Sequence, residues 1–303
     1  MRIRTALLIA MLASTAAYAV QAPESRPASK AMAPTPRTTI AIAYGTHPLQ
    51  RLSLWPAIVA QPGGSAIATP LIVFVHGGGW SRGSKDNATS AWKIEHYPGA
   101  GYAFASIDYR LVPQATVEQQ AQDVADAVKV LLANAEKYHI DRRRIVLMGH
   151  SAGAHLVALV GTDERYLKRA GLSFGDLARV IPIDGVAYDV AAQVAQAGPL
   201  MRRTYTTAFG SDPARQRALS PIAQSASPNA PAFLLLHVQR PESIAQNRVL
   251  EAALLKAGTR VARRDFPGDG RSGHREINFR LGDPSYAATA AVDAWLETVF
   301  TKR

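Results

Sequence analysis

Two kinds of hydrophobic pattern alternate along most of the chain. Predominantly apolar runs at 71–75, 145–148 and 232–238 are typical of strands buried on both faces, as in a parallel sheet. Residues 117–138 instead carry apolar side chains at helical spacing, which predicts a helix packed against such a sheet. Strands that alternate with helices in this way indicate the α/β class of fold.

Shorter segments continue the alternation. They predict strands at 39–44, 50–55, 102–107 and 260–266, the first two antiparallel, and helices at 88–97 and 243–257. With 303 residues, 48% of them hydrophobic and 19% charged, the chain is long enough for one sizeable core. We therefore expect a single α/β domain over residues 39–303.

A short glycine-flanked segment follows the apolar run at 145–148. It has the sequence Gly149-His150-Ser151-Ala152-Gly153 and leads directly into helix-spaced apolar residues. The pattern Gly-x-Ser-x-Gly between a strand and a helix predicts a nucleophile elbow, a tight turn that holds the serine in a strained conformation with its hydroxyl exposed. The N–H of Ala152, at the start of the helix, would then face a developing oxyanion.

A second glycine-rich segment, His76-Gly77-Gly78-Gly79-Trp80, ends the apolar run at 71–75. Three consecutive glycines let the backbone approach a ligand closely and direct its N–H groups toward it. This is the chemistry that an oxyanion hole needs, although a glycine-rich turn without function has the same composition.

Three segments together resemble a known family. In this order and at these separations, His76–Trp80, Asp108–Pro113 and Gly149–Gly153 are similar to α/β-hydrolase esterases of the hormone-sensitive-lipase and bacterial carboxylesterase type. The resemblance extends from about Tyr44 to the C-terminus. It implies the α/β-hydrolase fold: an eight-stranded, mostly parallel sheet with helices on both faces and a small cap or none.

The same resemblance implies a set of roles. The catalytic triad would occur in the chain order serine, acid, histidine, with Ser151 as the nucleophile. The oxyanion hole would be formed by the backbone N–H groups of Gly78 and Gly79 together with that of Ala152. A small cap, where one is present, would be inserted between residues 189 and 220.

The triad histidine is expected near the end of the chain. After the predicted strand at 260–266 comes a glycine-rich segment, 267–273, that ends at His274. A histidine on a flexible loop after the last strand lies where such a fold brings an imidazole over the nucleophile, so we expect His274 to be the general base. A lone surface histidine is common, but the position and the chain order favour the catalytic role.

The acid is less clear from the sequence. The family expects Asp or Glu a few residues after the strand at 232–238, where this chain has Arg240, and the nearest carboxylate is Glu242. We expect Glu242 to be the acid, although a carboxylate at a helix start is also favoured by the helix dipole. Asp184, at the end of the preceding strand, is the alternative acid. Two further aspartates are third choices: Asp189 and Asp269.

The first residues of the chain have the pattern of a targeting segment. Residues 1–19 combine Arg2 and Arg4 with a short apolar run and a small-residue cleavage pattern at 17–19, which predicts a secretory signal peptide. Residues 20–38 are rich in Pro and Ala and predict a flexible tether. We therefore expect a periplasmic or secreted protein.

Charge and composition limit the partners. Removing residues 1–19 takes away Arg2 and Arg4, so the net charge falls from +11 to +9. The basic residues are scattered and lack interleaved aromatics, so we expect no nucleic-acid partner. No apolar run is long enough for a membrane span, and the absence of cysteine excludes disulfides and thiolate metal sites. The sequence leaves the oligomeric state open.

The sequence predicts a serine hydrolase that cleaves carboxylic esters, with short acyl groups, through an acyl-enzyme and without cofactor or metal. The substrate is expected to be a small-molecule or polysaccharide-linked ester. Four aromatic residues are equally compatible with a substrate pocket and with ordinary packing: Trp80, Tyr109, Tyr188 and Phe209. Two alternatives remain, an amide or formamide hydrolase or peptidase of the same fold and a non-catalytic α/β-hydrolase-like binding protein.

Overall fold

A computed structural model describes residues 38–58 and 67–300 of the chain. The expected signal peptide at 1–19 and the expected tether at 20–38, apart from Thr38, lie outside the described residues. Within them, the strands are β1 (Ile40–Ala43), β2 (Arg51–Trp55), β3 (Thr69–Val75), β4 (Ala103–Ile107), β5 (Ile140–His150), β6 (Arg179–Ile183), β7 (Ala232–Val238) and β8 (Arg260–Phe266).

The helices follow the strands in the alternation that the sequence predicts. They are α1 (Ala91–Gly99), α2 (Val117–Ala133), α3 (Ala152–Thr162), α4 (Glu164–Arg169), the 3₁₀ helix η1 (Phe174–Asp176), α5 (Val190–Gln196), α6 (Pro199–Phe209), α7 (Pro213–Ala218), α8 (Pro221–Gln224), α9 (Pro241–Lys256), α10 (Gly270–Arg280) and α11 (Ala287–Phe300).

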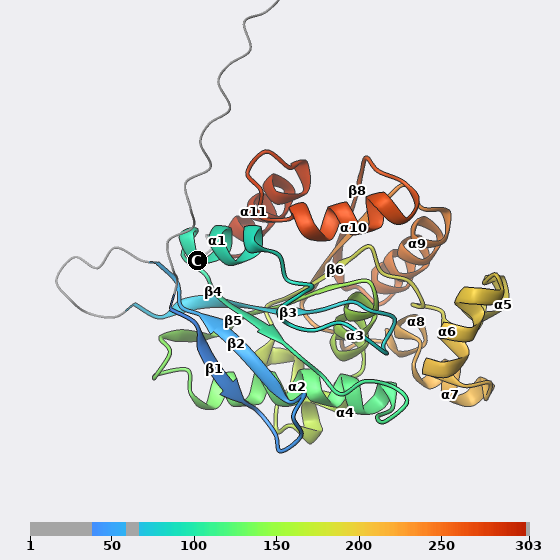
Figure 1. Ribbon diagram of the computed structural model, residues 1–303, viewed down its shortest axis with the longest axis horizontal. Helices are drawn as coiled ribbons and strands as arrows, with labels where there is room; N and C mark the ends of the chain where they lie inside the picture. The colour runs from blue at the N-terminus through green and yellow to red at the C-terminus, as the bar shows by residue number, and fades with distance from the viewer. Residues whose placement is uncertain (1–37, 59–66, 301–303) are drawn as a thin grey trace, which may run out of the picture. The chain divides into compact units, whose positions relative to one another are not determined.

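The described strands form one sheet of eight, in the order β1-β2-β4-β3-β5-β6-β7-β8 (Figure 1). The strand β2 pairs antiparallel with both β1 and β4, whereas all the other neighbouring strands pair in parallel. The expected eight-stranded, mostly parallel sheet is therefore confirmed, and so is the antiparallel pairing of the two leading strands.

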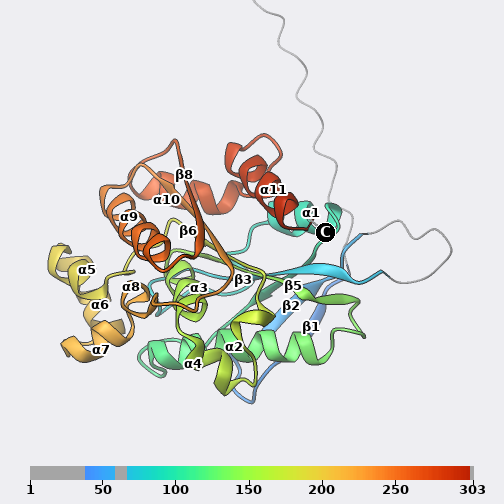
Figure 2. The ribbon, with the colours of Figure 1, turned by 180° about the vertical axis from the view of Figure 1, so that it is seen from behind.

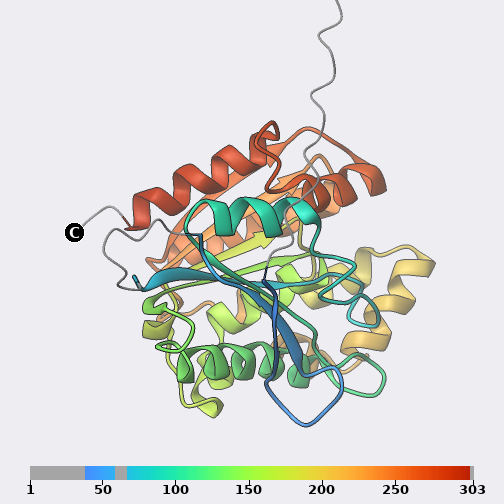
Figure 3. The same cartoon turned by 60° about the vertical axis from the view of Figure 1, so that its left-hand side comes forward.

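Helices cover both faces of this sheet, as expected. Successive side chains of a strand point to opposite faces, so Val73 and Leu147 enter one hydrophobic cluster with residues of α2, α3 and α9. Ile72 and Val146 enter a second cluster with residues of α1, α10 and α11. Figure 3 shows α2 on one side of the sheet and α1 with α11 on the other. This double coverage explains why the central strands are apolar on both faces.

The parallel pairing brings the candidate site segments to one edge of the sheet. The strands β3, β5, β6 and β7 are consecutive neighbours, so their carboxyl ends lie side by side. The glycine-rich segment follows β3, and Ser151 follows β5. Asp184 follows β6, and Arg240 comes shortly after β7. In open α/β sheets this edge is where ligands bind.

The segment 189–220, where the resemblance implies a small cap, contains three short helices. Figures 1 and 2 show α5, α6 and α7 grouped together on one side of the domain. Within the described part of the chain, no helix is both long enough and apolar enough to cross a membrane.

Candidate active site

Ser151 occupies the turn between β5 and α3. Its φ is 56° and its ψ is −116°, a strained conformation for a residue with a side chain. The flanking glycines are required by close packing. A Cβ on Gly149 would lie 2.3 Å from the carbonyl oxygen of Gly153, and one on Gly153 would lie 2.1 Å from that of Val75. The strained turn that the sequence predicts is therefore present.

His274 lies between Ser151 and a carboxylate. Its Nε2 is 3.1 Å from the Ser151 Oγ, and its Nδ1 is 2.5 Å from the Asp184 Oδ2. The Asp184 side chain is fully buried, whereas that of His274 is 21% exposed. The geometry brings together a hydroxyl, an imidazole and a carboxylate in the chain order that the resemblance implies.

The local structure around His274 differs from the expectation. The sequence predicts a flexible loop, but His274 lies within α10, which begins at Gly270. The reason is close packing of the glycines, because a Cβ on Gly273 would lie 2.5 Å from the carbonyl carbon of Gly268. These glycines allow the first turn of the helix to pack against the preceding turn, so they build a fixed support for the imidazole.

Asp184 stands directly after β6 with a φ of +46°. Besides His274, three donors contact its carboxylate: the Ser243 hydroxyl at 2.7 Å, the Val238 N–H at 3.3 Å and the Arg240 Nη1 at 2.6 Å. A buried carboxylate needs such donors because desolvation of an unpaired charge is costly. The surroundings of Asp184 therefore favour its ionised form.

Glu242, the first choice for the acid, is not in contact with His274. Its side chain is 44% exposed, and its Oε1 accepts hydrogen bonds from the Nε and Nη2 of Arg240 at 3.0 and 2.7 Å. The physical reason is its place in the first turn of α9, where the helix dipole favours a carboxylate that faces solvent. The preference for Glu242 over Asp184 is therefore corrected: Asp184 is the carboxylate beside the imidazole.

The third-choice aspartates have structural partners. Asp189 caps α5 by accepting a hydrogen bond from the Ala192 N–H at 3.0 Å. Asp269 precedes α10 as its N-cap residue, and its carbonyl oxygen accepts the Gly273 N–H at 2.8 Å. Within the described part of the chain, neither carboxylate forms a hydrogen bond with His274.

Arg240 is a member of the site that sequence analysis did not assign. Its Nη1 lies 2.6 Å from the His274 Nδ1 as well as from Asp184. An arginine N–H donates only, so the Nδ1 either accepts from Arg240 or donates to Asp184, and it does not do both. When the Nδ1 donates to Asp184, the Nε2 faces Ser151 without a proton, as a general base requires. The sequence signal for this role is the arginine itself, which stands where the family expects the acid.

The pKa of the Asp184 carboxyl is set by opposing effects. Burial alone would raise this pKa, but the hydrogen bond from His274, the charges of Arg240 and His274 and the Ser243 hydroxyl outweigh it and hold the pKa well below its usual range. Asp184 therefore stays ionised in the folded protein at neutral pH.

This shift predicts a pH dependence of stability. A carboxyl binds protons more weakly in the folded state when its pKa is lowered, so its stabilisation is present above the unfolded-state pKa of about 3.9. That stabilisation is lost as the pH falls further. We expect the unfolding free energy, measured by urea titration between about pH 5 and pH 2, to fall less steeply in Asp184→Asn than in the wild type. Equal slopes would contradict the lowered pKa.

The backbone of the glycine-rich segment adopts conformations that favour glycine, with a φ of 133° at Gly78 and 59° at Gly79. Across residues 38–58 and 67–300, their N–H groups donate to no backbone acceptor. Ala152 is the first residue of α3, where an N–H has no acceptor within the helix. These three N–H groups remain the candidates for an oxyanion hole.

The support under this segment comes from His76. Burial lowers the pKa of His76 to about 4, so its ring is neutral and its Nδ1–H donates to the Gly77 carbonyl at 2.7 Å. The ring stacks on Tyr109 with centroids 4.3 Å apart, and the Tyr109 hydroxyl donates to the His76 carbonyl at 2.9 Å. The segment is thereby tied to the loop after β4, which belongs to the second segment of the family resemblance.

We expect Gly78→Ala to lower kcat by about 10²- to 10³-fold, the effect of losing one oxyanion donor. The added Cβ would lie 1.9 Å from the Arg82 carbonyl oxygen, so the backbone must shift. Gly99→Ala is the matched control, because no atom lies within 4 Å of a Cβ placed there. Steady-state hydrolysis of a chromogenic ester measures both variants, and an unchanged kcat in Gly78→Ala would argue against this segment's role.

The four aromatic residues considered for a substrate pocket are core residues instead. They are at most 2% exposed: Trp80, Tyr109, Tyr188 and Phe209. The Trp80 ring, for example, packs edge-on against Phe209 with centroids 4.7 Å apart. A different set of residues, on α6 and on the glycine-rich segment, lines a cleft of about 180 Å³ that includes Gly79.

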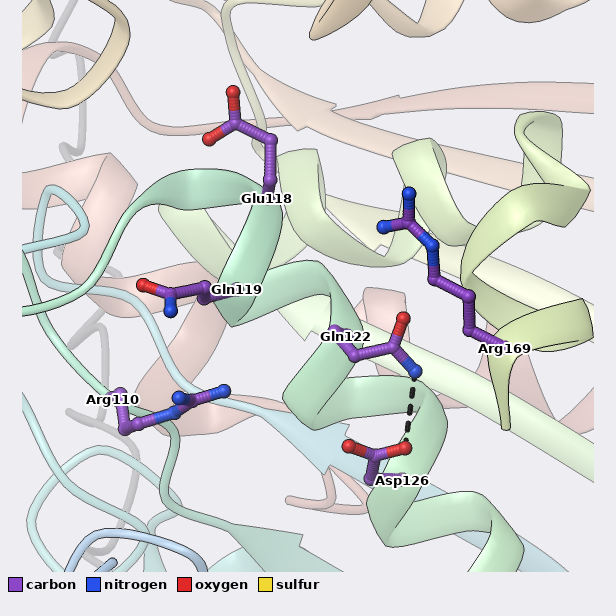
Figure 4. Close-up of a pocket in the computed structure, with 6 residues that line it drawn as sticks. All are labelled: Arg110, Glu118, Gln119, Gln122, Asp126 and Arg169. Atoms are coloured by element: carbon purple, nitrogen blue, oxygen red, sulfur yellow. Dashed lines mark hydrogen bonds between the residues drawn. The ribbon is translucent and has the colours of Figure 1, made fainter.

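A larger surface cavity, of about 360 Å³, lies elsewhere (Figure 4). Its lining residues are Arg110, Glu118, Gln119, Gln122, Asp126 and Arg169. Several of these groups are engaged within the protein: Glu118 with Arg215, and Gln122 with Asp126 at 3.0 Å. Unlike the cleft that includes Gly79, this cavity is lined by none of the candidate catalytic or oxyanion-hole residues, so its size does not make it the reaction site. Among the residues described, no cluster of three or more His, Asp or Glu is placed to hold a metal ion.

The sequence of the chain is similar to a known family and to known esterases. A family model described as BD-FAE matches residues 59–253. Esterase LipC of Mycobacterium tuberculosis is 31% identical over 212 residues, which are 66% of this chain and 50% of LipC. A probable isoprenylcysteine alpha-carbonyl methylesterase of Oryza sativa is 35% identical over 39% of this chain and 27% of its own length. The chain thus spans about half or less of these relatives.

Solved structures share the fold. A truncated carbohydrate esterase from gut microbiota matches with a TM-score of 0.71 and 21% identity, over 88% of this chain and 97% of the other. Esterase B from Lactobacillus rhamnosis matches with a TM-score of 0.68 and 21% identity, over 87% of this chain and 84% of the other. At such identities the likeness concerns the fold, and it confirms the expected α/β-hydrolase architecture.

Proposed function

The chain belongs to the BD-FAE family, and from this premise we propose that it hydrolyses carboxylic esters through Ser151, His274 and Asp184. The observation that carries the proposal is the continuous contact from the Ser151 Oγ through the imidazole of His274 to the buried carboxylate of Asp184. The names of its relatives, an esterase and a probable methylesterase, favour an ester over an amide.

The reaction follows the acyl-enzyme course. The Ser151 Oγ attacks the ester carbonyl carbon while the His274 Nε2 takes its proton, and Asp184 stabilises the imidazolium that forms. The N–H groups of Gly78, Gly79 and Ala152 stabilise the tetrahedral oxyanion. The intermediate then expels the alcohol, which receives the proton from His274. Water activated by His274 next attacks the acyl-enzyme, releasing the carboxylic acid and restoring Ser151.

The test of this function is a pair of substrates with the same acyl group, 4-nitrophenyl acetate and 4-nitroacetanilide. We expect hydrolysis of the ester and, in comparison, negligible hydrolysis of the anilide. Comparable turnover of the anilide would favour the amide hydrolase. If the protein binds esters but hydrolyses neither substrate, the result would favour the non-catalytic binding protein as the alternative.

The finer points of the proposal concern acyl length and location. The cleft that includes Gly79 is only about 180 Å³, which suits an ester with small substituents and is compatible with short acyl groups. We therefore expect kcat/KM to fall from 4-nitrophenyl butyrate to the octanoate. The segment 1–19 has the sequence of a signal peptide, so export to the periplasm or the medium is part of the proposal. N-terminal sequencing of the exported protein is expected to begin at Val20.

A further inference from the structure

Helix α6 is fixed against the glycine-rich segment by one of its faces. The rings of Tyr205 and Phe209 pack edge-on against Trp80, with centroid distances of 6.0 and 4.7 Å. The helix also approaches the segment closely, because a Cβ on Gly79 would lie 3.2 Å from the Thr204 Cγ2. The position of α6 relative to the candidate oxyanion hole is therefore held by core packing.

A different stripe of α6 lines the cleft beside Gly79. Its residues follow the spacing i, i+3, i+4 and i+7, which places them on one side of a helix: Leu200, Arg203, Thr204 and Thr207. Ser81 and Gly79, from the glycine-rich segment and its continuation, complete the lining. Gly79 belongs both to this lining and to the candidate oxyanion hole. A substrate whose carbonyl oxygen sits at the oxyanion hole would therefore extend into this cleft.

The chemistry of the cleft is cationic and polar. Arg203 is the one charged residue of its lining, and three hydroxyl-bearing residues accompany it: Ser81, Thr204 and Thr207. Within the residues that the structure describes, none of the ion pairs involves Arg203. The adjacent Arg202 differs, because its Nη2 and Nε donate to the carbonyls of Ala195 and Ala197 at 3.1 and 3.3 Å.

We propose that this cleft recognises a carboxylate group on the substrate, with Arg203 as a specificity-determining residue. The proposal rests on the esterase function above and names its substrate class: esters whose acyl or alcohol part carries a negative charge. A planar guanidinium matches a carboxylate with two parallel hydrogen bonds, and the hydroxyls of Ser81 and Thr204 can donate to the same oxygens. The Thr207 hydroxyl instead donates to the Arg203 carbonyl at 2.8 Å. The exposed Leu200 contacts the apolar part of the same substrate group.

The experiment uses two matched pairs of esters. In the first pair, 4-acetoxybenzoate carries a negative charge on the alcohol side of the ester and 4-acetoxybenzamide does not. In the second pair, monomethyl adipate carries a negative charge on the acyl side and methyl hexanoate does not. In the wild type we expect kcat/KM for the charged member to exceed that for the neutral member by about tenfold in one pair. That pair identifies the side of the ester that occupies the cleft.

Arg203→Gln is expected to abolish this preference, so that kcat/KM for the charged ester falls about tenfold, to the level of its neutral partner in the same variant. Arg202→Gln is the control, since it removes an equal charge from the same helix, and it is expected to keep the preference. Raising the salt concentration should weaken the preference in the wild type, because partly exposed charges are screened.

Two outcomes would overturn the proposal, and they differ from each other. If the neutral esters are hydrolysed but neither pair shows a preference that depends on Arg203, the carboxylate site is absent and the esterase function stands. If the wild type hydrolyses none of the esters, the esterase function itself fails, and the carboxylate site fails with it.

Discussion

Replacing Asp184 by asparagine is expected to lower kcat by about 10⁴-fold, the loss typical of a triad that keeps its shape without its charge. An asparagine amide can turn its N–H toward the imidazole, which then holds the wrong tautomer for a general base. Glu242→Gln is the matched control, because the Glu242 carboxylate contacts only Arg240 among the groups of the site. We expect kcat of Glu242→Gln to stay within a few-fold of the wild type.

Folding must be checked alongside activity in these variants. Asp184 is fully buried and is paired with Arg240, so its replacement leaves a largely buried guanidinium without one partner. Circular dichroism and thermal melting of each variant separate lost catalysis from lost structure. A large fall in kcat for Glu242→Gln, with little change for folded Asp184→Asn, would reverse the assignment of the acid.

Replacing Ser151 by alanine is expected to have a still larger effect, about 10⁶-fold in kcat, because no acyl-enzyme can form. The fold should survive, since alanine retains a Cβ like that of serine and loses only the hydroxyl. Ser272→Ala is the control: this exposed serine, two residues before His274, donates only to the Asp269 carbonyl at 3.3 Å. Steady-state rates of 4-nitrophenyl acetate hydrolysis measure both variants, and residual wild-type turnover in Ser151→Ala would locate the nucleophile elsewhere.

Much of the fold follows from local sequence patterns. The apolar run at 232–238 becomes β7 with the predicted bounds, because a strand buried on both faces is apolar throughout. The strand predicted at 260–266 becomes β8, also with the predicted bounds, although it carries four charged side chains. The glycines around Ser151 and the run before it likewise specify a strand, a tight turn and a helix within a few residues of each other. The family resemblance then implies the chain order of the triad residues: serine, acid, histidine.

The identity of the acid depends on contacts that no local pattern encodes. Asp184 and Glu242 both follow strands of the same edge, but only the pairing of β6 beside β7 shows which carboxylate lies next to His274. The Arg240 guanidinium pairs with Glu242 through its Nε and Nη2, while its Nη1 contacts Asp184. An arginine where the family expects the acid is the sequence signal that favours Asp184.

Local sequence patterns also did not predict which aromatic side chains are buried or that His274 lies in a helix. The aromatic side chains near the site, such as Trp80 and Phe209, hold α6 in place rather than face the substrate. An aromatic residue has the same sequence signature in either setting, and only the packing of neighbouring elements distinguishes them. Similarly, the glycines before His274 permit close helix packing, although glycine-rich segments usually predict loops.

The central claim, that Ser151 is an activated nucleophile, is tested most directly by covalent labelling. The protein is treated with a fluorophosphonate, which transfers its phosphonyl group to an activated serine oxygen with loss of fluoride, and its mass and peptide fragments are then measured. The account predicts one adduct on Ser151 in the wild type, and no adduct in Ser151→Ala. An adduct on another residue, or an unlabelled wild type that is fully folded, would contradict it.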